Sequence, residues 1–193
     1  MKRKAVFLDR DGTINVEKNY LYKIEDFQFI EGVPEAIALL NQKGYLVIVV
    51  SNQAGVARGY YTEKDVQSLH EYINSELEKK EAHIDAFYYC PHHPVAGIGC
   101  YKRECHCRKP ETGMFEQACL EFPIDRKDSW MIGDNCSDIE AGKKFQLKTM
   151  LVRTGYGEEL EKKGYKDFDE IANDLPDAIR KILFQEENKN EQD

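Results

Sequence analysis

Residues 7–13 read FLDRDGT, an apolar run that ends in two aspartates, Asp9 and Asp11, followed by a glycine. The segment 4–8, KAVFL, has the short and uniformly apolar composition of a strand that is buried on both faces. A buried strand does not tolerate unpaired carboxylates, because each one needs a counter-charge or has to become neutral. The two acids therefore indicate that a partner for acidic groups sits at the end of this strand.

Strands and helices alternate along the rest of the chain. Strand patterns occur at 4–8, 45–50, 84–90, 129–133 and 147–152, and helical patterns at 34–44, 63–80, 113–122, 138–145 and 176–184. This alternation predicts an α/β fold, a Rossmann-like parallel sheet with helices on both faces. Such sheets bind ligands outside the carboxyl ends of their strands, where VVSNQ (49–53) and MIGDN (131–135) also place polar residues.

Length and charge narrow the class of protein. The 193 residues fit one domain, which we expect over 1–186 with a polar tail over 187–193. The formal net charge of −8 argues against a nucleic-acid binder, which normally shows a basic face, but it allows a small phosphorylated substrate. No apolar run approaches the roughly 18 residues of a membrane span, and the N-terminal run is too short for a secretory signal. We expect a cytoplasmic monomer without nucleic-acid or membrane partners.

Two familiar uses of acids and glycines do not fit this sequence. An EF-hand calcium loop that began at Asp9 would need an acidic ligand at its twelfth position, where Tyr20 stands. Neither glycine-rich phosphate-binding pattern, G-x-x-x-x-G-K-[ST] or G-x-G-x-x-G, occurs in the chain. Any phosphate must therefore be bound by other means.

A magnesium site satisfies the carboxylates together. Asp9 and Asp134, at neighbouring strand ends, would form an acidic nest for Mg²⁺, which prefers a few oxygen ligands together with waters and substrate phosphate. Asp9 would then attack phosphorus and form an aspartyl-phosphate intermediate. Asp11 points to the same side of an extended chain, where it would protonate the leaving oxygen and later accept a proton from water.

Four segments in this order, FLDRDGT, VVSNQ, CRKP (107–110) and MIGDNCSD (131–138), resemble the four motifs of the haloacid dehalogenase superfamily of phosphatases. The resemblance spans about residues 5–153 and implies a fold of this superfamily. The intervals between the motifs are too short for a separate cap domain, so small loops would have to select the substrate.

The resemblance also assigns roles to single residues. It makes Asp9 the nucleophile and Asp11 the general acid and base, and it binds Mg²⁺ through Asp9, the backbone carbonyl of Asp11 and Asp134. Ser51 would donate a hydrogen bond to the transferring phosphoryl group, and Lys109 would balance its charge. By the same pattern, Asp138 supports the site rather than touching the metal.

The loop 90–108 contains four of the six cysteines. CPHHP (90–94) and CHC (105–107) give Cys-x-His and, after twelve intervening residues, Cys-x-Cys. Three thiolates and one imidazole form a closed tetrahedral set for structural Zn²⁺. The predicted ligands are Cys90, His92, Cys105 and Cys107, with His93, Cys100 and His106 as spare candidates. The alternative is a loop of unrelated thiols.

Zinc would stiffen this loop and contribute folding free energy directly. Arg108 and Lys109 follow Cys107 at once, so the metal would position these cations without taking part in the chemistry. Cys119 fits helix packing, and the sequence leaves the role of Cys136 open.

The pairing of CPHHP and CHCRKP with DRDGTIN (9–15) and SNQAGVARG (51–59) narrows the resemblance to heptose bisphosphate phosphatases, which are similar to histidinol-phosphate phosphatases. It implies a Mg²⁺-dependent sugar-phosphate phosphatase with a structural zinc, in nucleotide-activated heptose synthesis for bacterial surface polysaccharide. The substrate contacts that it implies are Glu17, Lys18, Asn19, Tyr20, Ser51, Asn52, Gln53, Ala54, Arg108 and Lys109.

Three alternatives remain beside this interpretation. Histidinol phosphate could be the substrate, or the chain could be a non-catalytic module that binds zinc and phosphate. A polynucleotide end phosphatase shares the aspartate motif but would require a basic surface.

Overall fold

A six-stranded parallel sheet in the order β3-β2-β1-β4-β5-β6 forms the centre of the molecule in the computed structural model, which describes residues 2–190. The strands are β1 (Ala5–Leu8), β2 (Leu46–Asn52), β3 (Ala86–Cys90), β4 (Trp130–Gly133), β5 (Lys148–Val152) and β6 (Glu170–Ala172). The α/β fold expected from the sequence is thus confirmed, with β1 paired to β2 on one side and to β4 on the other.

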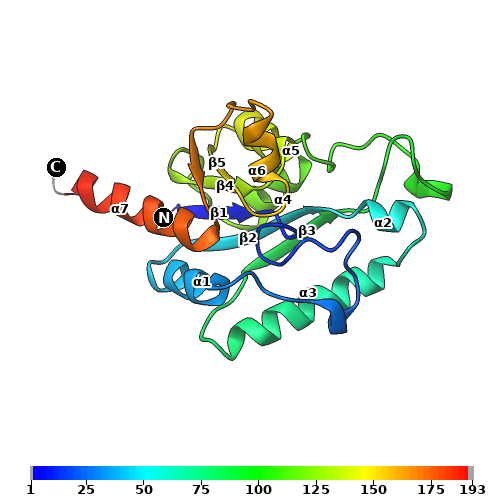
Figure 1. Ribbon diagram of the computed structural model, residues 1–193, viewed down its shortest axis with the longest axis horizontal. Helices are drawn as coiled ribbons and strands as arrows, with labels where there is room; N and C mark the ends of the chain where they lie inside the picture. The colour runs from blue at the N-terminus through cyan, green and yellow to red at the C-terminus, as the bar shows by residue number, and fades with distance from the viewer. Residues whose placement is uncertain (1, 191–193) are drawn as a thin grey trace.

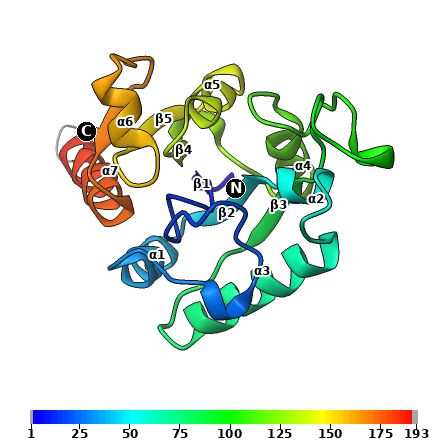
Figure 2. The same cartoon turned by 45° about the vertical axis from the view of Figure 1, so that its right-hand side comes forward.

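Seven α-helices connect the strands in residues 2–190. They are α1 (Val33–Gln42), α2 (Ala54–Ala57), α3 (Glu63–Glu78), α4 (Gly113–Glu121), α5 (Cys136–Lys144), α6 (Gly157–Lys162) and α7 (Leu175–Asn190). Figure 1 and Figure 2 show α1, α3 and α7 on one face of the sheet and α4 and α5 on the other.

Alternate residues of each central strand feed two separate cores. Val6 and Leu8 of β1 point into the core formed with α1, α3 and α7, whereas Ala5 and Phe7 point into the core formed with α4 and α5. A strand buried on both faces cannot show an apolar/polar alternation, which is why KAVFL is apolar throughout. Because both faces of β1 are buried, the position of Asp9, directly after Leu8, is fixed by the packing of the strand.

Capping side chains begin two of the helices. Thr62 directly precedes the helix expected over 63–80 and caps α3: it accepts a hydrogen bond from the backbone of Asp65, whose carboxylate accepts one from the backbone N–H of Thr62. Asn135 and Asp138 form the same reciprocal arrangement at the start of α5. This capping box holds Asp138 beside the end of β4.

Several elements differ from the prediction. The prediction did not include β6, α2 and α6, which are only three, four and six residues long. It also ended the last helix at 184, whereas α7 continues to Asn190. Residues 187–190 of the expected tail are therefore helical, and 191–193 lie outside the described residues. Within 2–190, no helix is both long and apolar enough to cross a bilayer.

Candidate active site

The carboxyl ends of β1, β2 and β4 open into one cavity of about 550 Å³. Every predicted catalytic and substrate-binding residue lines it except Lys18, whose ammonium donates to the backbone carbonyl of Asp26 at 2.6 Å. Sequence reasoning did not assign the remaining lining residues to the substrate site: Tyr61, Asn135, Ser137, Asp138 and Tyr156. Tyr61 lies two residues after SNQAGVARG and Tyr156 lies within TGYG (154–157), and only that proximity could have indicated them.

Three carboxylates crowd the floor of the cavity. Oxygens of Asp9, Asp134 and Asp138 all lie within 4.8 Å of one another. Burial raises the pKa of Asp9 to about 7, against the lowering effect of the Lys109 ammonium, and the negative charges of Asp138 and Asp11 raise it further. Burial and the charges of Asp9 and Asp138 raise the pKa of Asp134 to about 9. A divalent cation would relieve this crowding, so the donor set fits a metal.

Two glycines let the backbone close around Asp134. A Cβ atom on Gly12 would lie 2.3 Å from Oδ2 of Asp134, and one on Gly155 would lie 2.0 Å from the same oxygen. Both glycines have positive φ, a backbone conformation that other residues rarely adopt. The backbone N–H of Tyr156 donates to that oxygen at 2.8 Å, so Oδ2 is fixed and Oδ1 carries no protein hydrogen bond among the described residues.

Lys109 reaches the same floor from the end of the cysteine-rich loop. Its buried ammonium lies 2.8 Å from Oδ1 of Asp9 and 2.6 Å from Oδ1 of Asp138, and it donates to the carbonyl of Val50 at 2.6 Å. Burial lowers the pKa of Lys109, but the carboxylates of Asp138 and Asp9 outweigh that effect and raise it overall. The group therefore stays cationic.

The side-chain amide of Asn52 fixes the backbone of this lysine. It donates to the carbonyl of Lys109 at 3.0 Å and accepts from the backbone N–H of Lys109 at 3.0 Å. The end of β2 and the end of the loop are thereby joined.

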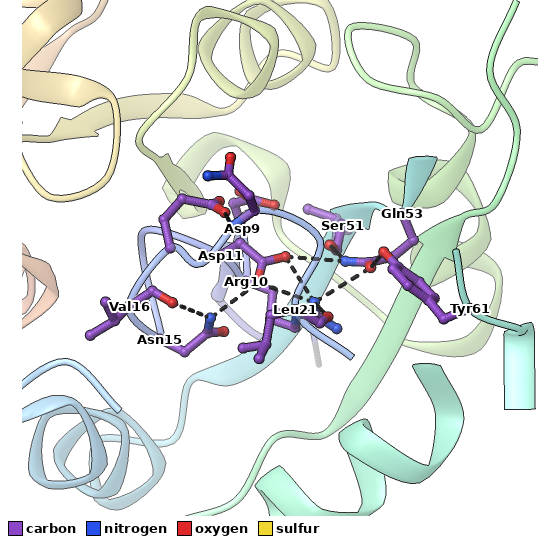
Figure 3. Close-up of polar contacts among 12 residues, drawn as sticks. Asp9, Arg10, Asp11, Asn15, Val16, Leu21, Ser51, Gln53 and Tyr61 are labelled. Carbon is purple, nitrogen blue, oxygen red and sulfur yellow. Dashed lines mark hydrogen bonds and ion pairs between the residues drawn. The ribbon is translucent and has the colours of Figure 1, made fainter. Parts of the chain in front are cut away.

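Asp11 is held above the floor by donors on several sides (Figure 3). Nη2 of Arg10 lies 3.1 and 2.9 Å from its two oxygens, and Nδ2 of Asn15 donates to Oδ1 at 3.0 Å. Nε2 of Gln53 lies 3.3 Å from Oδ2 of Asp11 and 2.6 Å from Oγ of Ser51. Because the Ser51 oxygen accepts from Gln53, its own O–H is left to donate into the cavity.

The segment 17–20 forms one wall of the cavity. Oε1 of Glu17 accepts from the backbone N–H of Asn19 at 2.6 Å. Asn19 and Tyr20 both have positive φ, which bends the segment sharply and turns it over the site. Burial, followed by the charge of Asp11, raises the pKa of Glu17.

The four predicted zinc ligands also come together. Their donor atoms lie within 4.8 Å of one another, with the three sulfurs of Cys90, Cys105 and Cys107 separated by 3.1–3.3 Å. Nδ1 of His92 lies 3.7 Å from the Cys90 sulfur and 3.5 Å from the Cys107 sulfur. Hydrogen bonding with Cys90, opposed by burial and supported by Cys105 and His92, lowers the pKa of Cys107 to about 5, while the same contact with Cys107 raises the pKa of Cys90. This set of donors fits Zn²⁺.

The spare candidates are engaged elsewhere or exposed. Nδ1 of His93 accepts from the backbone N–H groups of Val95 and Ala96, and Nε2 of His106 lies 2.9 Å from the Glu116 carboxylate. Cys100 is exposed and lies outside the donor group.

Arg108 connects the zinc ligands to the cavity. Its Nη1 donates to the carbonyl of His92 at 3.1 Å, and the residue lines the cavity beside Lys109. The metal set and the active-site cations therefore share one short stretch of backbone.

Comparison with known proteins agrees with this geometry. Residues 106–178 match the family model described as HAD-hydrolase-like. The matched region contains Lys109, Asp134 and Asp138, and the fold is that of the haloacid dehalogenase hydrolases. The site and the fold thus define a phosphomonoester hydrolase of this superfamily.

The relatives are more specific. The chain is 45% identical over 181 residues to the D-glycero-beta-D-manno-heptose-1,7-bisphosphate 7-phosphatase of Haemophilus ducreyi, covering 93% of this chain and 98% of the relative. It is 41% identical to the protein of the same name from Escherichia coli O6:H1, covering 92% and 94%. The chain belongs to the family of these heptose bisphosphate phosphatases.

A solved structure supports the same conclusion. The D,D-heptose 1,7-bisphosphate phosphatase from B. bronchiseptica, complexed with magnesium and phosphate, has a TM-score of 0.83 to this chain at 28% identity. The match covers 94% of this chain and 99% of that one.

Proposed function

We propose that this chain hydrolyses the 7-phosphate of D-glycero-D-manno-heptose 1,7-bisphosphate by way of a phosphorylated Asp9. The observation that carries the proposal is the meeting of Asp9, Asp11, Lys109 and Asp134 in one cavity. They meet in a chain that is 41–47% identical to relatives named for this reaction.

In the first half of the reaction, a carboxylate oxygen of Asp9 forms a bond to phosphorus and the bond from phosphorus to the sugar oxygen breaks. Asp11, in its acid form, gives its proton to that leaving oxygen. The Lys109 ammonium and the Ser51 hydroxyl hold the phosphoryl oxygens, because both groups face the Asp9 end of the cavity.

In the second half, Asp11 is a carboxylate and takes a proton from water. The water oxygen bonds to phosphorus, the bond between Asp9 and phosphorus breaks, and inorganic phosphate leaves. Asp11 thereby recovers its proton and Asp9 its negative charge.

The acidic floor fits Mg²⁺, with Asp9, Asp134 and the backbone carbonyl of Asp11 as ligands. When bound, the ion would neutralise the crowded carboxylates and the charge on the phosphoryl group. Asp138 pairs with Lys109 at 2.6 Å and with the backbone of Asn135, so we assign it a supporting role.

Zinc is proposed for Cys90, His92, Cys105 and Cys107, as a structural ion. The donor set is complete without a water or substrate ligand, which is typical of structural sites. Its contribution is to fix Arg108, which would contact the substrate together with the segments 17–20 and 51–54.

The biological setting follows from the substrate. We expect a cytoplasmic monomer that acts in the synthesis of nucleotide-activated heptose, and gel filtration tests the monomer. The curated relatives are named for the β-anomer, so we expect that anomer to be preferred.

The decisive experiment measures phosphate release with Mg²⁺ from three substrates: each anomer of the heptose bisphosphate, and histidinol phosphate. We expect kcat/KM to be highest for the β-anomer, with heptose 1-phosphate as the product. A preference for histidinol phosphate would transfer the assignment to that class. Absence of turnover on all three would favour a binding module.

A further inference from the structure

We propose that Arg10 is a positioning residue that holds the general acid Asp11 and the wall segment 17–21 in one fixed arrangement. This inference rests on the proposed function and goes beyond the residues assigned above. Arg10 lies between the two aspartates in the sequence, yet its side chain is fully buried rather than exposed in the cavity. A buried guanidinium therefore stands directly behind the reacting groups (Figure 3).

The contacts of Arg10 converge on a single nitrogen. Nη2 lies 2.9 Å from Oδ2 of Asp11, 2.9 Å from the carbonyl of Leu21 and 3.4 Å from Oε1 of Gln53. An Nη2 carries two hydrogens, so the two shortest contacts, to Asp11 and Leu21, take them. The guanidinium is thus a bridge from the acid to the end of the segment that carries Glu17, Asn19 and Tyr20.

The rest of the guanidinium has little to satisfy it. Nε and Nη1 are buried and have no hydrogen-bond partner among the described residues. The one carboxylate that pairs with Arg10 in residues 2–190 is that of Asp11, whose side chain is 19% exposed. The counter-charge of a fully buried cation is therefore a catalytic group.

A purely structural role is a poor explanation for this arrangement. Replacing a whole buried ion pair with packed apolar groups is often neutral or stabilising, so the pair of Arg10 and Asp11 is weak evidence of a structural role, although removal of one partner alone is destabilising. What it adds is geometry, because Nη2 contacts both oxygens of Asp11 and so limits rotation of the carboxyl group.

Gln53 strengthens the arrangement from the opposite side. Its Oε1 faces two donors, the hydroxyl of Tyr61 at 2.7 Å and Nη2 of Arg10, so its NH₂ must face Asp11 and Ser51. Loss of Arg10 would therefore disturb the acid directly, whereas the Tyr61 hydroxyl would keep Gln53 in place beside Ser51.

The test compares Arg10→Gln and Arg10→Lys on two esters. Heptose bisphosphate has an alkoxide leaving group that needs the Asp11 proton, whereas p-nitrophenyl phosphate has a leaving group that does not. We expect Arg10→Gln to lower kcat/KM on heptose bisphosphate, which reports the half-reaction in which Asp11 protonates the leaving oxygen, about 100-fold, the lower part of the range for general acid catalysis. The loss on p-nitrophenyl phosphate should be about 10-fold smaller, and Arg10→Lys should restore part of the difference.

The matched control is Arg58→Gln. Arg58 is half-buried, its Nε also lacks a hydrogen-bond partner among the described residues, and its guanidinium lies 5.8 Å from the Tyr20 ring rather than on Asp11. This variant should leave the ratio of the two activities unchanged. Equal losses on both esters for a folded Arg10→Gln protein would overturn the proposal.

A second measurement covers the case in which Arg10→Gln does not fold. Arg10→Lys is combined with Asp11→Asn, and no further loss is expected in the double variant if Arg10 acts through Asp11. If the losses of the two single variants multiply in the double variant, Arg10 does not act through Asp11 and the proposal is refuted. If the unaltered chain does not turn over heptose bisphosphate, the substrate assignment fails, and β-glycerol phosphate replaces it as the alkyl ester in the same comparison.

Discussion

The acidic floor and the zinc loop both gather charged groups, but they are held together by different forces. The floor takes Asp9 and Asp134 from the ends of β1 and β4, two paired strands whose side chains are buried in two cores. The loop takes its four ligands from residues 90–107, where the three thiols lie in or against the core of α4 and α5 and the middle of the loop is joined to α2 and α3 by single hydrogen bonds of Ile98 and Tyr101. We therefore expect one site to be positioned by the fold and the other by the zinc ion proposed for it.

This contrast predicts different responses to the loss of a ligand. Removing a floor residue should abolish chemistry and leave the scaffold intact, because strand packing does not depend on it. Removing a loop ligand should loosen the loop and weaken substrate binding, because metal binding there is coupled to local folding.

The largest effect is expected for Asp9→Asn. The amide cannot form the phosphorylated intermediate, so kcat should fall by at least about 1,000-fold, a loss like those seen for other nucleophiles. The unfolding temperature should stay the same or rise, since one crowded buried charge is removed. Phosphate release and thermal unfolding measure the two halves of this prediction. Turnover close to that of the unaltered chain would exclude a covalent mechanism at Asp9.

The zinc loop gives the next largest effect. Cys105→Ser removes one of four ligands, and kcat/KM on heptose bisphosphate should fall about 100-fold with loss of bound zinc. The main unfolding transition should change less than activity, because Cys105 lies only at the margin of the core formed with α4 and α5 and residues 91–104 belong to neither of the two cores. Metal analysis and limited proteolysis within 91–104 report the loosening.

Cys100→Ser is the matched control for that variant. Cys100 belongs to the same loop but is exposed and outside the donor group, so its replacement should leave zinc content and activity unchanged. Equal zinc loss in both variants would mean that the ligand set is wrongly assigned.

The same contrast explains what the sequence could reveal. Strand ends, the two aspartates and the Cys-x-His and Cys-x-Cys pairs are local patterns, and the structure brings each set together as expected. Lys18 lies outside the cavity because the chain turns at Asn19 and Tyr20, which both have positive φ. The residues before this turn contain no pattern that predicts it. Tyr61 and Tyr156 enter the cavity through tertiary packing, and β6 is too short to leave an apolar run.

A smaller effect is expected where the two regions meet. Asn52→Ala removes both hydrogen bonds to the backbone of Lys109, which should lower kcat/KM about 10-fold and stability by about 1–2 kcal/mol. Asn74→Ala is the control, since the Asn74 amide likewise accepts from a backbone N–H, that of Ile84, but far from the cavity. It should reduce stability alone. Equal activity in the two variants would show that Lys109 is held without Asn52.

The smallest effect concerns the stability of the metal-free chain as pH changes. Because the folded-state pKa values of Asp9 and Asp134 are raised to about 7 and about 9 from 3.8, the folded state binds more protons than the unfolded state between these values. Their favourable contribution is present below 3.8 and is lost as pH rises through the folded values. Burial lowers the pKa of His70, so this group makes stability rise with pH, but only below its ordinary pKa of 6.5.

Between pH 6.5 and pH 9, the window set by His70 and Asp134, the lowered pKa of Cys107 makes stability rise with pH and opposes the two aspartates. The test is therefore a difference: without Mg²⁺, Tm should fall by a few degrees more over this window in the unaltered chain than in Asp134→Asn. Added Mg²⁺ competes with protons for the same oxygens, so its stabilising effect should grow with pH across that window. Asp134→Asn should remove this part of the slope and reduce the Mg²⁺ effect, while Cys105→Ser should leave the Mg²⁺ effect unchanged. A Mg²⁺ effect that survives Asp134→Asn at full size would place the ion elsewhere and break the distinction between the two sites.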